Sequence, residues 1–360
     1  MRVLEIETLA ELDRRVDAGA TVARGWHVQS VDLRERTAAL ARLDVTGTVF
    51  LGCRFADGVD DDVRRRGGLV FPAVPDVPFD PYRAELYSPD ELYAGLDESY
   101  AATPDARIHA WSHGGRAIDR TLASSLHDHA VDDALADYVR GRRVVGVMGG
   151  HAAERGTDGY REAARLGRLL GRDATVATGG GPGAMEAANL GARLADHPDG
   201  DLDSAIKSLA TVPSFAPDVT AWARTAMAVR ARFGQGRDSL GVPTWFYGHE
   251  PPNVFAEHVA KYFRNAIRED VLLRVCRSGV VFLPGAAGTV QEVFQSACEN
   301  YYAGPADVAP MVLVGRRHWT ALPVWPLLQR LAQDRAMEGH VHLVDEVDDV
   351  PALVADRATT

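Results

Sequence analysis

The stretch ATVATGGGPGAMEAANLGA, residues 174–192, decides the fold of this 360-residue chain. Its first residues predict a strand, and the glycines at 179–181 predict a turn. The alanine-rich part that follows predicts a helix, with Pro182 suited to the first helical position. A strand that enters a helix through a glycine turn is the basic unit of a parallel sheet with crossover helices on its faces.

Five further apolar runs have the character of strands, and helix-like segments separate most of them. They are TVFLGCRF (48–55), GGLVFPAVP (67–75), VVGVMGG (144–150), GVVFLPG (279–285) and APMVLVG (309–315). This alternation predicts an α/β protein with a Rossmann-like, doubly wound and mainly parallel sheet. No internal repeat is evident.

The organisation along the chain indicates two domains. Proline and glycine are densest in residues 71–89, which predicts a surface excursion at the edge of a lobe. Residues 121–141 then have apolar side chains at helical spacing and predict a helix leading into the next strand. We therefore expect a smaller N-terminal α/β lobe of unknown role over residues 1–118. A larger Rossmann-like domain should occupy residues 119–360.

Composition argues against several classes of function. A formal net charge of −11 disfavours broad nucleic-acid binding, because clustered Lys and Arg are what hold phosphate backbones. The cysteines Cys53, Cys276 and Cys298 form no CxxC pair, which argues against a disulfide framework or a zinc site. The first residues, MRVLEIETLAELDRR, carry acids unlike a signal peptide, and no apolar run is long enough to span a membrane. We expect a cytoplasmic protein that binds no metal, nucleic acid or membrane.

Three of the expected strands end in glycine-rich turns, and ligands of open parallel sheets bind beyond the carboxyl ends of the strands. The candidate binding residues are Gly149, Gly150 and His151 on the first turn, Gly180, Gly181, Gly183, Met185 and Glu186 on the second, and Gly285, Ala286, Gly288 and Thr289 on the third. Backbone N–H groups at the start of each following helix suit a phosphate, although a tight structural turn is the alternative. The first turn lacks the G-x-G-x-x-G pattern of a dinucleotide site.

Two charged residues near these turns are candidates for chemistry. Glu292 stands three residues after Thr289, a spacing that equally matches a helix capping box with no ligand. Arg268 stands four residues after Arg264 in an expected helix over 253–276, where like charges repel unless they share an anion. A forked guanidinium suits a phosphate, whereas pairing with neighbouring acids on a solvated face is the alternative.

These motifs resemble a known family. GGGPGAMEAANLGA (179–192) and PGAAGTVQE (284–292) are similar to the GGGxxGxM and PGGxGTxxE signatures of the Lonely Guy phosphoribohydrolases. VVGVMGGHAAERG (144–156), GPGAMEA (181–187) and EPPN (250–253) look closer still to the bacterial pyrimidine/purine nucleotide 5′-monophosphate nucleosidases of that superfamily.

The resemblance covers about residues 140–335 and implies a function. It implies hydrolysis of the N-glycosidic bond of a nucleoside 5′-monophosphate to free base and ribose 5-phosphate, without a cofactor. It implies Glu292 and Arg268 as catalytic residues and adds Asn253 of the EPPN motif to the substrate-binding set. We further expect a homo-oligomer, a dimer or higher.

One residue departs from the family pattern. Ala286 stands where the signature has its second glycine, and a methyl group there would crowd a phosphate or change a backbone angle. The competing hypothesis is therefore a non-catalytic binder of a nucleotide or phosphorylated cofactor, similar to the molybdenum-cofactor carriers of the same superfamily. The presence of Glu292 favours the enzyme, and Ala286 favours the binder.

Overall fold

The computed structural model describes residues 4–115, 118–247 and 250–354. The chain forms two compact units, a smaller one made of 1–85 and 113–134 and a larger one made of 86–112 and 135–360. The units interleave along the chain, because the segment 86–112 belongs to the larger unit. The expected boundary near residue 118 stays a prediction, and residues 116 and 117 beside it lie outside the described residues.

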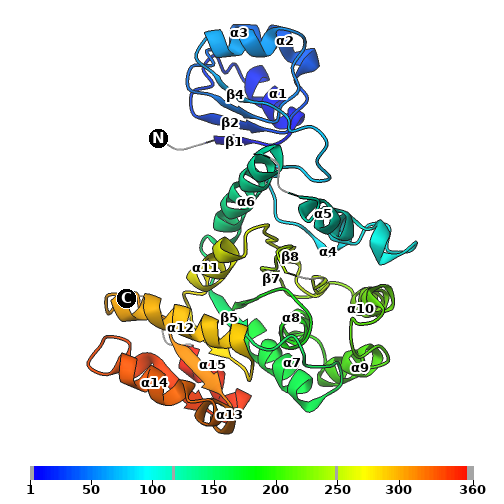
Figure 1. Ribbon diagram of the computed structural model, residues 1–360. Helices are drawn as coiled ribbons and strands as arrows, with labels where there is room; N and C mark the ends of the chain where they lie inside the picture. Colours follow the sequence, from blue (N-terminus) through cyan, green and yellow to red (C-terminus); the bar gives the residue numbers. More distant parts are fainter. Residues whose placement is uncertain (1–3, 116–117, 248–249, 355–360) are drawn as a thin grey trace. The chain divides into compact units, whose positions relative to one another are not determined.

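The smaller unit is built on a parallel sheet with the strand order β1-β2-β3-β4 (Figure 1, blue). Its elements are β1 (Leu4–Ile6), α1 (Leu9–Asp17), β2 (Trp26–Gln29), α2 (Thr37–Arg42), β3 (Val49–Leu51), α3 (Val59–Arg65) and β4 (Leu69–Phe71). Every strand lies beside its neighbour in sequence, so right-handed crossovers bring the connecting helices to one face of the sheet. The buried residues between helices and sheet include Ile6, Leu12, Val28, Leu40, Phe50 and Val63.

A repeat of about 22 residues underlies the smaller unit. Paired positions on neighbouring strands are 22, 22 and 20 residues apart along the chain. Gly25, Gly47 and Gly67 precede successive strands with φ of +80°, +73° and +89°, and each of the first two donates a backbone hydrogen bond of 3.0 Å to the next. The expectation of no repeat was wrong, because what recurs is a backbone conformation that only a glycine and a few apolar positions mark in sequence.

The larger unit contains a parallel sheet of seven strands among the described residues, in the order β11-β10-β9-β5-β6-β7-β8. Its strands are β5 (Val144–Met148), β6 (Thr175–Thr178), β7 (Ser239–Gly241), β8 (His258–Val259), β9 (Val280–Phe282), β10 (Met311–Val314) and β11 (Val341–Val344). The chain adds strands in one direction from β5 to β8 and in the other from β9 to β11. The order therefore reverses between β5 and β9, which confirms the expected doubly wound, Rossmann-like sheet.

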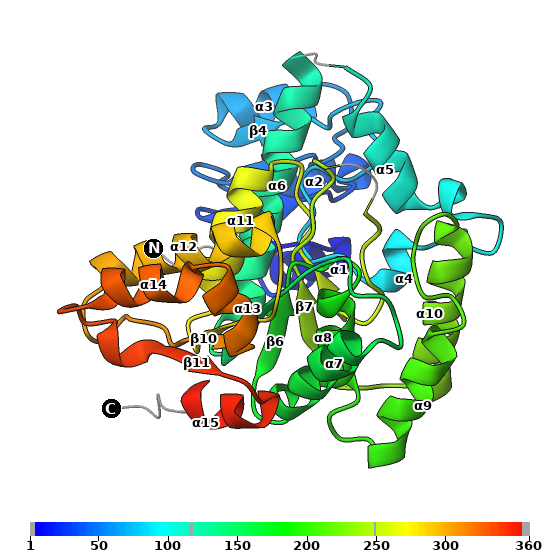
Figure 2. The same ribbon diagram turned by 60° about the horizontal axis from the view of Figure 1, so that its bottom comes forward.

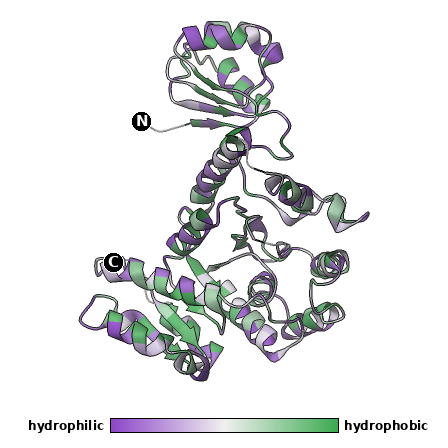
Figure 3. Cartoon of the chain, in the orientation of Figure 1, coloured by the Kyte–Doolittle hydropathy of each residue, from purple (hydrophilic) through white to green (hydrophobic). Residues whose placement is uncertain are grey.

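Helices cover this sheet, whose central strands are buried and mainly apolar (Figure 3). The helices of the rest of the chain are α4 (Pro89–Leu92), α5 (Pro104–Ser112), α6 (Ile118–Val139), α7 (Asp158–Gly171), α8 (Ala184–Arg193), α9 (Asp199–Leu209), α10 (Val219–Phe233), α11 (Asn265–Val275), α12 (Ala287–Tyr302), α13 (Arg316–Ala321), α14 (Val324–Ala332) and α15 (Val350–Val354). Helices α7 and α8 lie side by side (Figure 2), and a Cβ atom on Gly191 would stand 1.8 Å from the Ala164 carbonyl oxygen. No helix among the described residues is long and apolar enough to cross a membrane.

The expected helix over 253–276 was wrong in its first half. Helix α11 begins only at Asn265, and β8 occupies part of the segment before it. Two prolines precede Asn253, whose side-chain Oδ1 accepts hydrogen bonds from the N–H groups of Phe255 and Ala256 at 3.1 and 3.2 Å. This turn gives the backbone an alternative to helical hydrogen bonds. The apolar residues of the segment are buried as expected, but in an irregular chain.

Candidate active site

The three glycine-rich turns meet at the carboxyl ends of the strands of the larger unit. The N–H group of Ala184 donates to the Gly150 carbonyl at 3.1 Å, which joins the second turn to the first. A Cβ atom on Gly150 would lie 3.6 Å from the Pro284 carbonyl oxygen, so the third turn adjoins them. A Cβ atom on Gly183 would lie only 2.5 Å from the His151 carbonyl oxygen. The strand reversal thus brings the sequence-predicted turns together, and at Gly183 the spacing leaves room for glycine alone.

The second turn ends in an uncapped helix start. Gly180 and Gly183 have φ of +71° and +75°, the left-handed region that favours glycine. Helix α8 begins at Ala184 with Gly183 as its N-cap, so Pro182 precedes the helix instead of opening it. No side chain caps this end of the helix. Its backbone N–H groups are suited to an anion.

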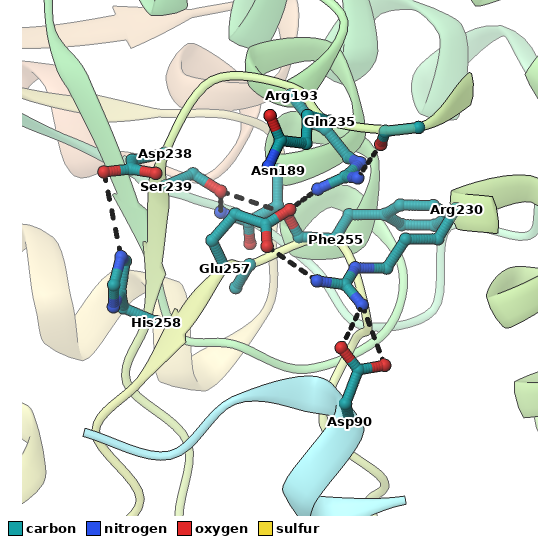
Figure 4. Close-up of polar contacts among 12 residues, drawn as sticks. Asp90, Asn189, Arg193, Arg230, Gln235, Asp238, Ser239, Phe255, Glu257 and His258 are labelled. Atoms are coloured by element: carbon teal, nitrogen blue, oxygen red, sulfur yellow. Dashed lines mark hydrogen bonds and ion pairs between the residues drawn. The ribbon is translucent and has the colours of Figure 1, made fainter. Parts of the chain in front are cut away.

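A network of buried polar side chains holds the backbone of the second turn in place. Asn253 donates from its backbone N–H to the Gly180 carbonyl at 2.8 Å and from Nδ2 to the Gly181 carbonyl at 3.2 Å. Its Nδ2 also donates to Asn189 Oδ1 at 3.0 Å. Asn189 in turn donates to the Ser239 hydroxyl at 3.1 Å (Figure 4). Asn253 is buried, so the structure places it as a support of the turn's backbone.

The third turn carries the departure from the family pattern. Ala286 is the N-cap of helix α12 with φ −102° and ψ −150°, an extended conformation that any residue adopts. Its side chain is exposed, and no side chain caps the helix. A Cβ atom on Gly285 would lie 2.1 Å from Thr289 Oγ1, whereas one on Gly288 would meet open space. Ala286 therefore introduces no backbone strain, and of these three positions only Gly285 is held to glycine by packing.

The capping-box alternative for Glu292 is wrong. Because Ala286 is the N-cap, Thr289 is the third helical residue, and Glu292 lies in the second turn of α12. A capping box needs the threonine at the N-cap and the glutamate at the third position. The Glu292 carboxylate is therefore free for another role.

Glu292 and Arg268 face each other beside the second turn. Arg268 Nη1 lies 3.8 Å from Glu292 Oε1, and the two side chains are 12% and 14% exposed. Arg268 also donates from Nε to the Val242 carbonyl at 2.7 Å and from Nη2 to the Gly179 carbonyl at 3.2 Å. These bonds tie helix α11 to the ends of β6 and β7 and hold the guanidinium in place.

Burial raises the pKa of Glu292 to about 7; the charge of Glu269 adds to this rise, and Arg268 opposes it. Desolvation disfavours the charged carboxylate, which explains the direction of the shift. A carboxyl group that titrates near neutral pH can accept and return a proton under physiological conditions. The arrangement is therefore able to perform general acid–base chemistry.

The structure gives Glu186 a partner that the sequence did not suggest. Arg155 donates to Glu186 from Nε at 2.9 Å and from Nη2 at 2.5 Å, and the Tyr160 hydroxyl adds a bond of 3.1 Å. Both the carboxylate and the guanidinium are buried. Glu186 thus anchors helix α8 to the loop after β5. Arg155 belongs to the VVGVMGGHAAERG motif (144–156), and this membership is what could have pointed to it in the sequence.

The remaining predicted residues lie around the turns. The sulfur of Met185 would contact a Cβ atom on Gly179 at 2.7 Å, so this side chain packs on the glycines. His151 is 59% exposed, and its Nδ1 lies 3.8 Å from Glu250 Oε1. Two residues that touch the turns, Glu250 and His318, were not among the candidates, although Glu250 opens the EPPN motif. The Nε2 atom of His318 lies 3.1 Å from the Gly285 carbonyl oxygen.

Comparison with known proteins adds little to these observations. No family model and no curated protein matches the chain. The molybdenum cofactor binding protein from Rippkaea orientalis is 16% identical, with a TM-score of 0.37, over 59% of this chain and 96% of its own. The protein TM1055 is 18% identical, with a TM-score of 0.38, over 60% of this chain and 99% of its own. These likenesses are weak, and the strand order of the chain itself establishes the fold class.

Proposed function

We propose that this chain is a phosphoribohydrolase of the Lonely Guy superfamily that hydrolyses the N-glycosidic bond of a nucleoside 5′-monophosphate. The observation that carries the proposal is the pairing of Glu292 with Arg268, 3.8 Å apart, beside glycine turns that end in uncapped helices. The motif resemblance described above supports the same assignment.

The two helix starts suit the 5′-phosphate. Helices α8 and α12 begin on turns that each adjoin the first turn, and neither helix has a side-chain cap. The Ala184 N–H already donates to the Gly150 carbonyl, which leaves the next N–H groups of α8 and the first ones of α12 for an anion. Together with the positive dipole ends of the helices they attract a phosphate, so a chain with a net charge of −11 needs no basic surface to hold one. Arg268 adds a fixed positive charge at the same place.

Glu292 would carry the chemistry. As the bond between C1′ and the base nitrogen breaks, its electron pair leaves with the base and positive charge develops on the sugar. A carboxylate near C1′ stabilises that charge and takes a proton from the attacking water, whose oxygen forms the new bond to C1′. The proton on Glu292 is then available to the departing base. A pKa of about 7 suits a group that accepts a proton and returns it.

The experiment that tests the proposal is incubation of the purified protein with AMP, GMP, CMP, UMP and IMP, and with the matching nucleosides. We expect free base from at least one monophosphate and much slower release from its nucleoside, because the nucleoside offers no phosphate to the helix starts. Glu292→Gln should lower turnover roughly 10²- to 10⁴-fold while nucleotide binding survives. Glu299→Gln, further along α12, is the matched control and should keep wild-type turnover.

Two results would contradict the proposal. Wild-type turnover in Glu292→Gln would remove the carboxylate from the mechanism. Tight binding of nucleotides without release of any base would assign the chain to the non-catalytic binders, and we then expect Glu292→Gln to bind as well as the wild type.

A further inference from the structure

Each member of the Arg268–Glu292 pair has a sequence neighbour that reaches across to the other helix. Glu269 follows Arg268 on α11, and Gln291 precedes Glu292 on α12. Gln291 Nε2 donates a hydrogen bond to Glu269 Oε2 at 2.6 Å. The two helices are thus joined by side chains directly adjacent to the proposed catalytic pair.

The second oxygen of Glu269 is held as well. Asn265, the first residue of α11, donates from Nδ2 to Glu269 Oε1 at 2.7 Å and to the Tyr247 hydroxyl oxygen at 2.9 Å. Asn265 is 9% exposed, whereas Tyr247 and Gln291 are exposed, so the anchor joins a buried amide to the protein surface. With both carboxylate oxygens bonded, Glu269 has a defined orientation and is not a mobile surface side chain.

We propose that Glu269 is a positioning residue for the reaction, which holds α11 and α12 at the separation that keeps Arg268 opposite Glu292. This inference rests on the proposed function. A displacement of about 1 Å between groups that act together can lower a rate roughly 10²-fold, which is why a bridge at the adjacent positions matters. None of the sequence motifs described above includes Glu269.

The charge of Glu269 has a second effect on the same site. The groups around Glu292 are Arg268 and Glu269 from α11 and the Cys276 thiol that follows α11. Burial keeps the thiol of Cys276 protonated by raising its pKa, so among the described residues the charges that act on Glu292 are those of Arg268 and Glu269. Glu269 raises the pKa of Glu292 and Arg268 lowers it. Removal of the Glu269 charge alone should therefore move the ionisation of Glu292 to lower pH.

The test separates the bridge from the charge with two substitutions. Glu269→Ala removes both and should lower kcat roughly 10-fold or more with little change in KM. Glu269→Gln removes the charge and keeps the bridge, because its amide oxygen still accepts from Gln291. Its amide N–H₂ faces the Asn265 Nδ2 donor, so the Asn265 amide must turn over to present Oδ1, which accepts no hydrogen bond here, and the Tyr247 hydroxyl can then donate to the same oxygen. This variant should keep kcat within about twofold at high pH, while the acidic limb of the pH profile moves to lower pH. Gln291→Ala removes the other side of the bridge and should also lower kcat.

Asp270→Ala is the matched control, because it removes an acid from the next position of α11. Asp270 is 52% exposed and pairs with Arg274 at 3.4 Å within its own helix. Kinetics of Glu269→Ala equal to those of Asp270→Ala, in proteins with the same melting temperature, would overturn the positioning role and leave the proposed function intact. An inactive wild type would instead overturn the proposed function, and this inference with it. An equal loss of kcat in Glu269→Gln and Glu269→Ala would show that charge, not position, is what Glu269 supplies.

Discussion

The two units of this protein use the same parts in a different order. Both have parallel strands joined by helices, but the smaller unit places its strands as β1-β2-β3-β4, whereas the larger reverses direction between β5 and β9. Where the order reverses, the loops after adjacent strands leave toward opposite faces and open a crevice. All three glycine-rich turns of the candidate site lie at the carboxyl ends of the larger sheet. In this protein the glycine-rich turns therefore gather in the unit whose strand order reverses.

Surface and buried carboxylates differ in their pKa, and each unit supplies an example. In the smaller unit, hydrogen bonds from Arg34 lower the pKa of Asp32 to about 2, and Arg36 lowers the pKa of Asp13. In the larger unit, burial raises the pKa of Glu292 to about 7. Paired carboxylates at a surface stay ionised at all physiological pH values, whereas a buried one is poised to exchange a proton.

The largest difference between the units in stability and nucleotide binding should follow when a glycine at a helix N-cap is replaced by alanine. Gly183→Ala places a Cβ atom 2.5 Å from the His151 carbonyl oxygen at a φ of +75°. We expect a loss of about 2 to 5 kcal/mol in unfolding free energy or an opened crevice with weakened nucleotide binding. Urea unfolding and nucleotide titration measure the two outcomes.

Gly58→Ala in the smaller unit is the matched control. Gly58 is the N-cap of α3 with φ +77°, and its added Cβ would meet nothing within 4 Å. It should cost only the backbone strain, about 1 to 2 kcal/mol, without an effect on nucleotide binding. Equal effects of both substitutions would mean that the contact between the first and second turns is unimportant.

An intermediate effect concerns the pH dependence of stability. The raised pKa of Glu292 means that the folded protein binds more protons than the unfolded chain between about pH 4.5 and 7, so stability falls as the pH rises through this window. Glu292→Gln has no carboxylate to ionise in the buried site. Its free energy of unfolding should therefore exceed that of the wild type by up to about 3 kcal/mol at pH 8 and equal it near pH 4.5. Unfolding in urea at both pH values provides the measurement.

The lowered pKa values in the smaller unit should make its stability change with pH in the opposite direction. Asp13 and Asp32 have lowered pKa values. Their ionised forms therefore stabilise the folded unit above about pH 4, and this stabilisation is lost as the pH falls toward 2. A stability difference between wild type and Glu292→Gln that does not change from pH 4.5 to 8 would contradict the assigned pKa.

The smallest effect is expected at Ala286. Ala286→Gly adds backbone freedom to the unfolded chain and should cost roughly 0.5 to 1 kcal/mol of stability. Because the native φ is −102° and the side chain is exposed, kcat/KM should stay unchanged. Hydrolysis that appears only in the glycine form would instead show that the methyl group blocks the substrate, as the binder hypothesis requires.

The α/β class, the strands that end in glycine turns and the candidate charged residues could all be predicted from the sequence. Each of these signals is local, because turn chemistry and strand periodicity act over a few residues. Helix α11 shows the limit of such signals. Apolar spacing extended it back to residue 253, but the Asn253 turn and the pairing of β8 with β7 took that segment out of the helix.

The tertiary structure alone decided which charges meet. Glu186 pairs with Arg155, 31 positions away, and Asn253 supports Gly181 across 72 positions. Glu292 lost its capping role because α12 starts at Ala287. Its raised pKa depends on burial by elements that are distant in sequence. Which distant segments pack together depends on the order of all the strands in the sheet, and no local pattern of residues specifies that order.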